Sequence, residues 1–151
     1  MKLLPHEKKR LHPPWARTSP DVDVLMRLDR SRRVYKTAYS MDDSMRVIVT
    51  LILPAGAIVK APYGWFKRDP RAVEFGKCRA SRAQVVGIRE LSGRGKRRPK
   101  SFKKARSRYN SRFIYRLGAT VKPRFRFGVS LLECTSGIHF FHTRSEAEAY
   151  C

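Results

Sequence analysis

A run of β-branched apolar residues that stops abruptly is the feature that most constrains how this chain can fold. Arg46-Val-Ile-Val-Thr-Leu-Ile-Leu53 suits a pleated sheet, and Pro54-Ala-Gly56 interrupts regular structure directly after it. The longest apolar run, Val47 to Val59, contains this interruption and falls well short of the roughly 20 residues that span a bilayer. We therefore expect core strands at 46–53 and 57–59, and no membrane span.

Two segments before this run have the pattern of strands. From Val22 to Asp29, every second residue is apolar, and three of the four residues between them are charged. The second segment, Val34 to Tyr39, follows a short polar stretch. The pattern predicts a hairpin, and a short helix over residues 21–30 is the alternative.

The chain after the core strands predicts a loop followed by further strands. Residues 61–76 are interrupted by Pro and Gly, which favours a loop with Trp65 and Phe66 exposed on it. Strands are predicted at 84–89 and 113–117, and Thr120-Val121 extends the second of these.

The C-terminus carries the clearest local signal. Gly137 precedes a strand at 138–141, and Thr143-Arg-Ser-Glu146 is a capping box that predicts a helix over 144–150. The fold class is therefore α+β and mainly β, a small antiparallel sheet or partly open barrel closed by one short C-terminal helix. Residues 21–151 form one domain, with a basic connector at 93–112.

The first twenty residues predict an extended basic arm. They contain four Pro residues, which disfavour a helix, together with five Lys or Arg. Trp15 and Arg17 are the expected anchor of this arm on a partner, because a large aromatic side chain can dock an extended segment. The alternative is a disordered basic tail.

Positive charge is concentrated in one segment. The net charge is +22, and residues 91–125 carry +13 of it because no acidic residue lies between Glu90 and Glu133. An unpaired run of this density predicts contact with a polyanion or an acidic protein, and a solvated loop that touches nothing is the alternative. The expected contact residues are Arg94, Lys96, Arg97, Arg98, Lys100, Lys103, Lys104, Arg106, Arg108 and Arg112.

Aromatic residues are interleaved with these charges, at Phe102, Tyr109, Phe113, Tyr115 and Phe125. Such side chains can stack on nucleic-acid bases or serve as inward strand residues, and for 113, 115 and 125 we favour the core. No helix-turn-helix, zinc finger or ribonucleoprotein motif accompanies the segment, so sequence-specific recognition is not predicted.

Metal and catalytic sites are weakly supported. Cys134, His139 and His142, with Cys151 or Cys78 as a fourth ligand, match no zinc module well, and strand alternation would separate the two His side chains. No spacing argues for a nucleophile beside a base, and the adjacent Asp42-Asp43 suits a turn. We expect no enzyme, metal, cofactor or small-molecule substrate, and the three scattered cysteines favour a reducing compartment.

Five segments of the chain have a familiar pattern: 36–39, 47–57, 77–85, 113–118 and 134–150. The most specific is Cys-x-x-Gly-Ile-His-Phe-Phe followed by the capped helix. Together they resemble a small domain of unknown function that occurs in giant viruses and other large DNA viruses, often beside pentapeptide repeats. The resemblance covers roughly residues 35–151 and implies a viral origin and a compact, mainly β domain. No pentapeptide repeats are present here, and the connector at 93–108 looks longer and more basic than in relatives.

Together these observations favour a non-enzymatic structural protein of a large DNA virus particle, a minor capsid or internal cement component. Its expected partners are capsid proteins of the same particle, and DNA or RNA by charge. Its expected location is the virion, or otherwise the cytoplasm or nucleus of the infected host cell. A nucleic-acid-binding protein without sequence specificity is the alternative, and a small enzyme or inhibitor acting on acidic substrates is a third hypothesis.

Overall fold

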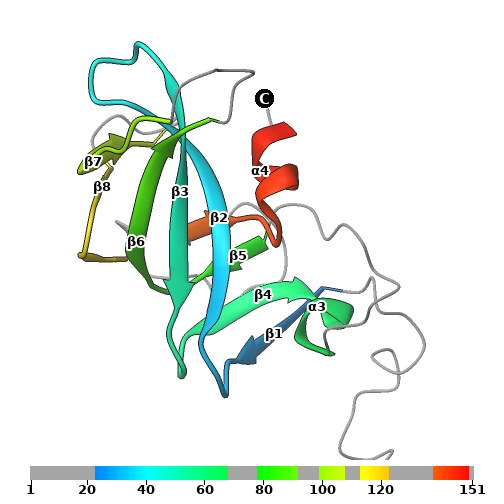
Figure 1. The fold of residues 1–151 in the computed structure, drawn as a ribbon. Helices are drawn as coiled ribbons and strands as arrows, with labels where there is room; N and C mark the ends of the chain where they lie inside the picture. The colour runs from blue at the N-terminus through cyan, green and yellow to red at the C-terminus, as the bar shows by residue number, and fades with distance from the viewer. Residues whose placement is uncertain (1–22, 68–77, 92–98, 108–112, 123–137, 150–151) are drawn as a thin grey trace, which may run out of the picture.

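The computed structural model describes residues 23–67, 78–91, 99–107, 113–122 and 138–149. This part of the chain is mainly β, with two antiparallel sheets that do not close into a barrel and one short C-terminal helix (Figure 1). The predicted fold class is therefore confirmed. The arm at 1–20 lies outside the described residues, so its extended conformation stays a prediction.

The larger sheet has six strands in the order β8-β7-β2-β3-β6-β9. In chain order these are β2 (Arg32–Tyr39), β3 (Arg46–Leu53), β6 (Ala83–Glu90), β7 (Lys104–Arg106), β8 (Ile114–Arg116) and β9 (Thr120–Val121). The β-branched run of the sequence is β3, which lies between β2 and β6 near the centre of the sheet, as a core strand should.

The smaller sheet has four strands in the order β1-β4-β5-β10. They are β1 (Asp23–Arg27), β4 (Ile58–Pro62), β5 (Cys78–Ala80) and β10 (Ile138–Phe140). The hairpin predicted for the first two segments is wrong, although both are strands. β1 pairs with β4, and β2 pairs with β3. Each of the two strands therefore pairs with an apolar strand from later in the chain instead of with the other.

The core lies between the sheets and is formed by alternate residues. Alternate β3 side chains from Val47 to Leu53 are fully buried. A bulge on β6, opposite Thr50 and Leu51, shifts the alternation there. As a result Val85 and Ile88 are both buried, while the side chain between them, Val86, is exposed.

The predicted loop at 61–76 begins instead with the end of β4 and a short helix, α3 (Tyr63–Lys67). The expectation that Trp65 is exposed is wrong, since its side chain is 0% exposed. Its ring lies 5.6 Å from that of Phe140, and Arg32 stacks over it at 3.7 Å. These partners are distant in sequence, so the local Pro and Gly content could not reveal the burial. Residues 68–77 are outside the described ranges.

The basic connector contains regular structure that the sequence did not predict. Residues 104–106 form β7, with Ala105 fully buried, and the preceding residues bond to β6 through Phe102 N–H to Ile88 O at 2.9 Å. Ala105 is the one inward residue of β7 and both its neighbours are cations, so the sequence shows no alternation of apolar and polar residues that would predict a strand. Thr120-Val121 is also a strand of its own, paired with β6 and separated from β8 by a turn at Gly118.

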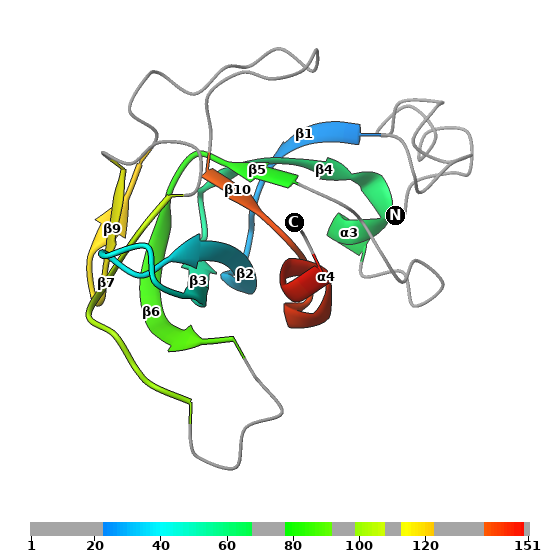
Figure 2. The same ribbon diagram turned by 90° about the horizontal axis from the view of Figure 1, so that it is seen from above.

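The C-terminal helix α4 (Arg144–Ala149) begins at the predicted capping box. Glu146 N–H donates to Thr143 Oγ1 at 3.1 Å, and Thr143 N–H donates to Glu146 Oε1 at 3.4 Å. The helix covers the outer face of β2 and β3, where Ala147 packs with Ile48 (Figure 2). Neither described helix is long and apolar enough to cross a membrane.

Candidate functional site

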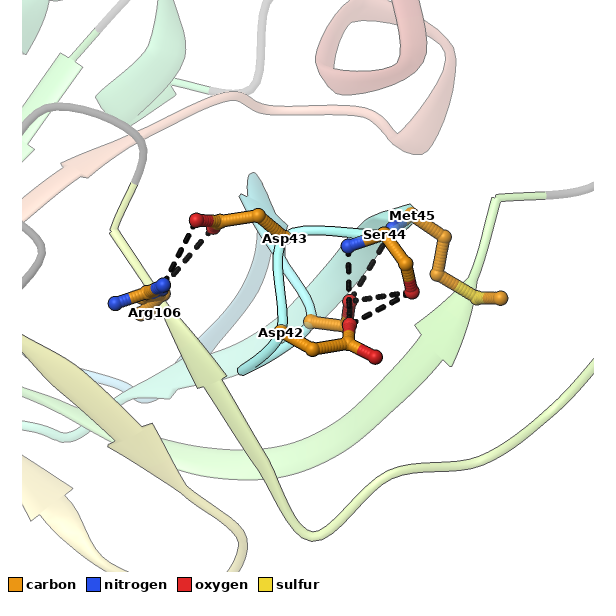
Figure 3. Close-up of polar contacts among 6 residues, drawn as sticks. Asp42, Asp43, Ser44, Met45 and Arg106 are labelled. Carbon is orange, nitrogen blue, oxygen red and sulfur yellow. Dashed lines mark hydrogen bonds and ion pairs between the residues drawn. The ribbon is translucent and has the colours of Figure 1, made fainter.

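The turn between β2 and β3 is organised by one carboxylate. Asp42 Oδ1 accepts hydrogen bonds from Ser40 Oγ at 2.7 Å, Ser44 Oγ at 2.7 Å and Ser44 N–H at 3.0 Å (Figure 3). These donors favour the charged form and hold the pKa of Asp42 at about 2, below its usual 3.8. The prediction that the acidic pair lies in a turn is confirmed, and backbone hydrogen bonding is confirmed for Asp42.

The second carboxylate of the turn binds a cation of the basic segment. Asp43, in the left-handed backbone region with φ of 61°, accepts two hydrogen bonds from Arg106 on β7, at 2.7 and 3.1 Å (Figure 3). This bidentate ion pair joins residues 63 positions apart. Arg106 was predicted to contact a polyanion, and in the structure its Nε and Nη2 bind Asp43, which offsets its charge.

Four other cations remain exposed around β7 and β8. Lys104 lies directly opposite Arg116 in the antiparallel register, so both side chains project from one face of the sheet. Lys103 and Lys100 precede them along the chain and are exposed as well. No carboxylate lies within ion-pair distance of these four side chains in the part of the chain that the structure describes. We refer to Lys100, Lys103, Lys104 and Arg116 as the basic ridge.

An open hollow of about 380 Å³ separates the ridge from the β2–β3 turn. Phe102 and Met41 supply its apolar lining, and Met41 is 41% exposed. Lys103, Lys104 and Asp42 lie around them. Phe102 also packs against the core, so only part of its ring is open to a ligand. Such a surface can accept a flat apolar group next to an anion.

The predicted contact residues divide into three groups. Lys100, Lys103 and Lys104 are brought together in the ridge, whereas Arg106 is held in the ion pair. Arg116 was not among the predicted contacts, and its cross-strand position beside Lys104 depends on a register that the sequence does not display. The remaining predicted residues lie outside the described ranges: Arg94, Lys96, Arg97, Arg98, Arg108, Arg112, Trp15 and Arg17.

The core assignment of two interleaved aromatics is confirmed. Tyr115 is 2% exposed, and Phe113 packs against the core with its ring 5.1 Å from that of Tyr115. Phe125 and Tyr109 are outside the described residues. Of the interleaved aromatics that the structure describes, only Phe102 reaches the hollow.

Burial shifts the pKa of two described side chains. Burial raises the pKa of the Cys78 thiol far above its usual value, and burial likewise raises the pKa of the Tyr115 hydroxyl. No three His, Cys, Asp or Glu side chains gather as metal ligands in the described ranges. Cys134 and Cys151, two members of the zinc alternative, lie outside those ranges.

Comparison with known proteins places the chain in a family. Neither the search of curated proteins nor the search of solved structures found a similar protein. A family model matches residues 23–147, which include every described element except the end of α4. This confirms the prediction of an uncharacterised domain, and the chain belongs to DUF5758, a family of unknown function.

Proposed function

We propose that this chain is a non-enzymatic binding protein that docks onto nucleic acid through the basic ridge, without reading its sequence. The observation that carries the proposal is the exposure of four neighbouring cations, none of which forms an ion pair with a carboxylate of the described residues. Asp42 lies across the hollow from Lys103 and Lys104, and Glu90 Oε1 accepts a hydrogen bond only from the backbone N–H of Lys100, at 3.1 Å. Lysine and arginine side chains neutralise phosphates and release counterions, which supplies binding that does not depend on base sequence.

The hollow beside the ridge supports nucleic acid over an acidic protein. Phe102 offers an aromatic surface next to Lys103 and Lys104, and bases of any identity can stack on such a surface. Asp42 stays ionised at neutral pH because its pKa is about 2, so it repels phosphate from the turn side of the hollow. Phosphates would then lie along the ridge, with a base towards Phe102.

A non-enzymatic role is supported by the state of the described titratable groups. An acid or base catalyst works best when its pKa lies near the working pH. The pKa of Asp42 is about 2, whereas burial keeps Cys78 and Tyr115 protonated at neutral pH. Among the groups whose pKa is shifted, none is therefore tuned to exchange a proton at neutral pH.

The biological setting of the proposal is a large DNA virus particle, in which the ridge would bind the packaged genome. The sequence resemblance described above and the net charge of +22 support this setting, because a packaged genome supplies the phosphate that offsets such charge. Mass spectrometry of purified particles should detect the chain as a constant component. Its absence from particles would refute the setting while leaving nucleic-acid binding open.

Binding of a labelled mixed-sequence duplex DNA tests the proposal at the site. Lys103→Ala/Lys104→Ala should weaken binding about tenfold, because two phosphate contacts are lost. Arg33→Ala/Lys122→Ala is the matched control, since it removes two exposed cations that belong neither to the ridge nor to its hollow. The control should bind DNA within about twofold of wild type. Equal weakening of both variants would mean that total charge alone governs binding and would overturn the proposal.

A further inference from the structure

A second pocket lies at the other end of the molecule, where no part of the sequence predicted a site. It has a volume of about 400 Å³, within the range of small-molecule sites. The end of β1, the β1–β2 turn, the start of β2 and the end of α3 form it. Figures 1 and 2 both place β1 and α3 on the side opposite β7. The lining residues are Met26, Arg27, Leu28, Asp29, Arg30, Arg32, Phe66 and Lys67.

The pocket is strongly positive. Four cations and one carboxylate line it, which gives a net charge of +3. A cavity of this size with so many cations suits a multiply charged anion, and phosphate groups match the forked donors of arginine. Three of the cations lie within residues 27–32, and the fold brings Lys67 of α3 to them, a proximity that the sequence does not reveal.

Two of the arginines are held in place by their surroundings. Arg32 stacks over the Trp65 ring at 3.7 Å and donates to Trp65 O at 2.9 Å. Arg27 donates to Gly56 O at 3.0 Å, in the turn that bonds to Leu28. A guanidinium has five N–H donors, so the bond that anchors Arg27 leaves other donors of that side chain to bind a ligand. Such preorganisation lowers the entropy cost of binding.

One wall of the pocket is apolar and includes an aromatic ring. Phe66 is partly exposed, and its ring packs edge-to-face on Trp65 at 5.0 Å, which fixes its orientation. Met26, 41% exposed, and Leu28 complete the apolar lining. The pocket therefore offers a surface for a flat ring beside donors for phosphate.

We propose that this pocket binds a nucleoside diphosphate or triphosphate, with its phosphates on the cations of the β1–β2 turn and α3 and its base on Phe66. Arg30 and Lys67 are exposed at the pocket and supply charge to the phosphates. Asp29, the one carboxylate of the lining, can accept a hydrogen bond from a sugar hydroxyl. The site is separate from the basic ridge, and the two proposals stand or fall independently.

Calorimetric titration of the full chain tests this site, with ATP and inorganic tripolyphosphate as probes. ATP should bind saturably and about tenfold more tightly than tripolyphosphate, because only ATP has a base to stack on Phe66. Phe66→Leu should remove that difference while leaving tripolyphosphate binding intact, which also shows that the variant pocket is folded. Equal affinity of the wild-type protein for ATP and tripolyphosphate would overturn the proposal that the base stacks on Phe66.

A second experiment removes the charges that are proposed to bind the phosphates. Arg30→Ala/Lys67→Ala should lower the affinity for ATP and for tripolyphosphate at least about tenfold. Arg33→Ala/Lys122→Ala removes two exposed cations that do not line the pocket and should change neither affinity by more than about twofold. Failure of ATP to bind saturably, or equal losses in the two double variants, would contradict the proposal.

Discussion

Asp42 and Asp43 are neighbours in one turn, yet they have different roles. Asp42 shapes the turn through three hydrogen bonds from serine groups, whereas Asp43 reaches Arg106 on a different strand. The sequence indicates the first role, because Asp and Ser clusters commonly bond their own backbone. It does not indicate the second, since nothing local connects residues 43 and 106.

The depressed pKa of Asp42 makes a pH-dependent contribution to stability. A carboxylate whose folded pKa is lowered stabilises the fold fully above its unfolded pKa of 3.8, and this contribution is lost as the pH falls towards about 2. Asp42→Asn should therefore be less stable than wild type at pH 7, and the difference should shrink between about pH 4 and 2. Urea unfolding at pH 7, 4 and 2 measures it.

Asp29→Asn is the control for this comparison, because Asp29 makes no hydrogen bond in the described residues. A difference between Asp42→Asn and wild type that stays constant across these pH values would contradict the role assigned to the serine hydrogen bonds.

Release of Arg106 from its ion pair should strengthen nucleic-acid binding. Asp43→Asn tolerates the left-handed backbone at this position and removes the charge that occupies the guanidinium. One more cation beside Lys104 should raise duplex affinity about threefold at low salt. The stability lost with this exposed pair should be about 0.5 kcal/mol.

Asp23→Asn, an exposed carboxylate on β1, gives the same change in net charge away from the ridge. If it raised affinity as much as Asp43→Asn, total charge rather than the freed guanidinium would account for the gain.

At the scale of elements, the turn between β8 and β9 depends on a glycine. Gly118 has φ of 87°, and nothing lies within 4 Å of a Cβ built there. Gly118→Ala should therefore cost about 1 kcal/mol through backbone strain alone. Gly87, in β6, lacks such a φ, and its Cβ would meet Thr50 at 3.6 Å, an ordinary contact.

Gly87→Ala should accordingly be neutral or stabilise by about 0.5 kcal/mol. Chemical unfolding of the two variants measures the contrast, and a destabilised Gly87→Ala with an unaffected Gly118→Ala would contradict the described backbone.

Elements with a local signal were predictable, and those defined by distant partners were not. The β-branched run predicted β3, and the Thr143 capping box predicted α4, because both signals are contained within a few residues. β7 has one small buried residue, Ala105, and Trp65 is buried by Phe140 from the far end of the sequence. The pairing of β1 with β4 likewise depends on sheet assembly.

The candidate site follows the same division. The sequence shows the concentration of positive charge around residues 100–106. It does not show the ion pair that holds Arg106 on Asp43, or the strand register that places Arg116 opposite Lys104 in the basic ridge.

At the scale of the whole molecule, two groups of exposed cations in the described residues lie on opposite sides of a mainly β fold. The basic ridge is an exposed surface along β7 and β8, which suits a polymer, whereas cations from the β1–β2 turn and α3 surround one pocket, which suits a small ligand. A net charge of +22 would destabilise a compact chain by self-repulsion, so an anionic partner at the ridge should stabilise it.

The salt dependence of duplex DNA binding tests the central claim most directly. Each phosphate neutralised contributes roughly −0.9 to the slope of log affinity against log salt concentration. If Lys103 and Lys104 each bind a phosphate, the slope of Lys103→Ala/Lys104→Ala should be shallower than that of wild type by about 1.8. The slope of Arg33→Ala/Lys122→Ala should match wild type. A ridge variant whose slope equals that of wild type would show that the ridge does not bind the phosphates.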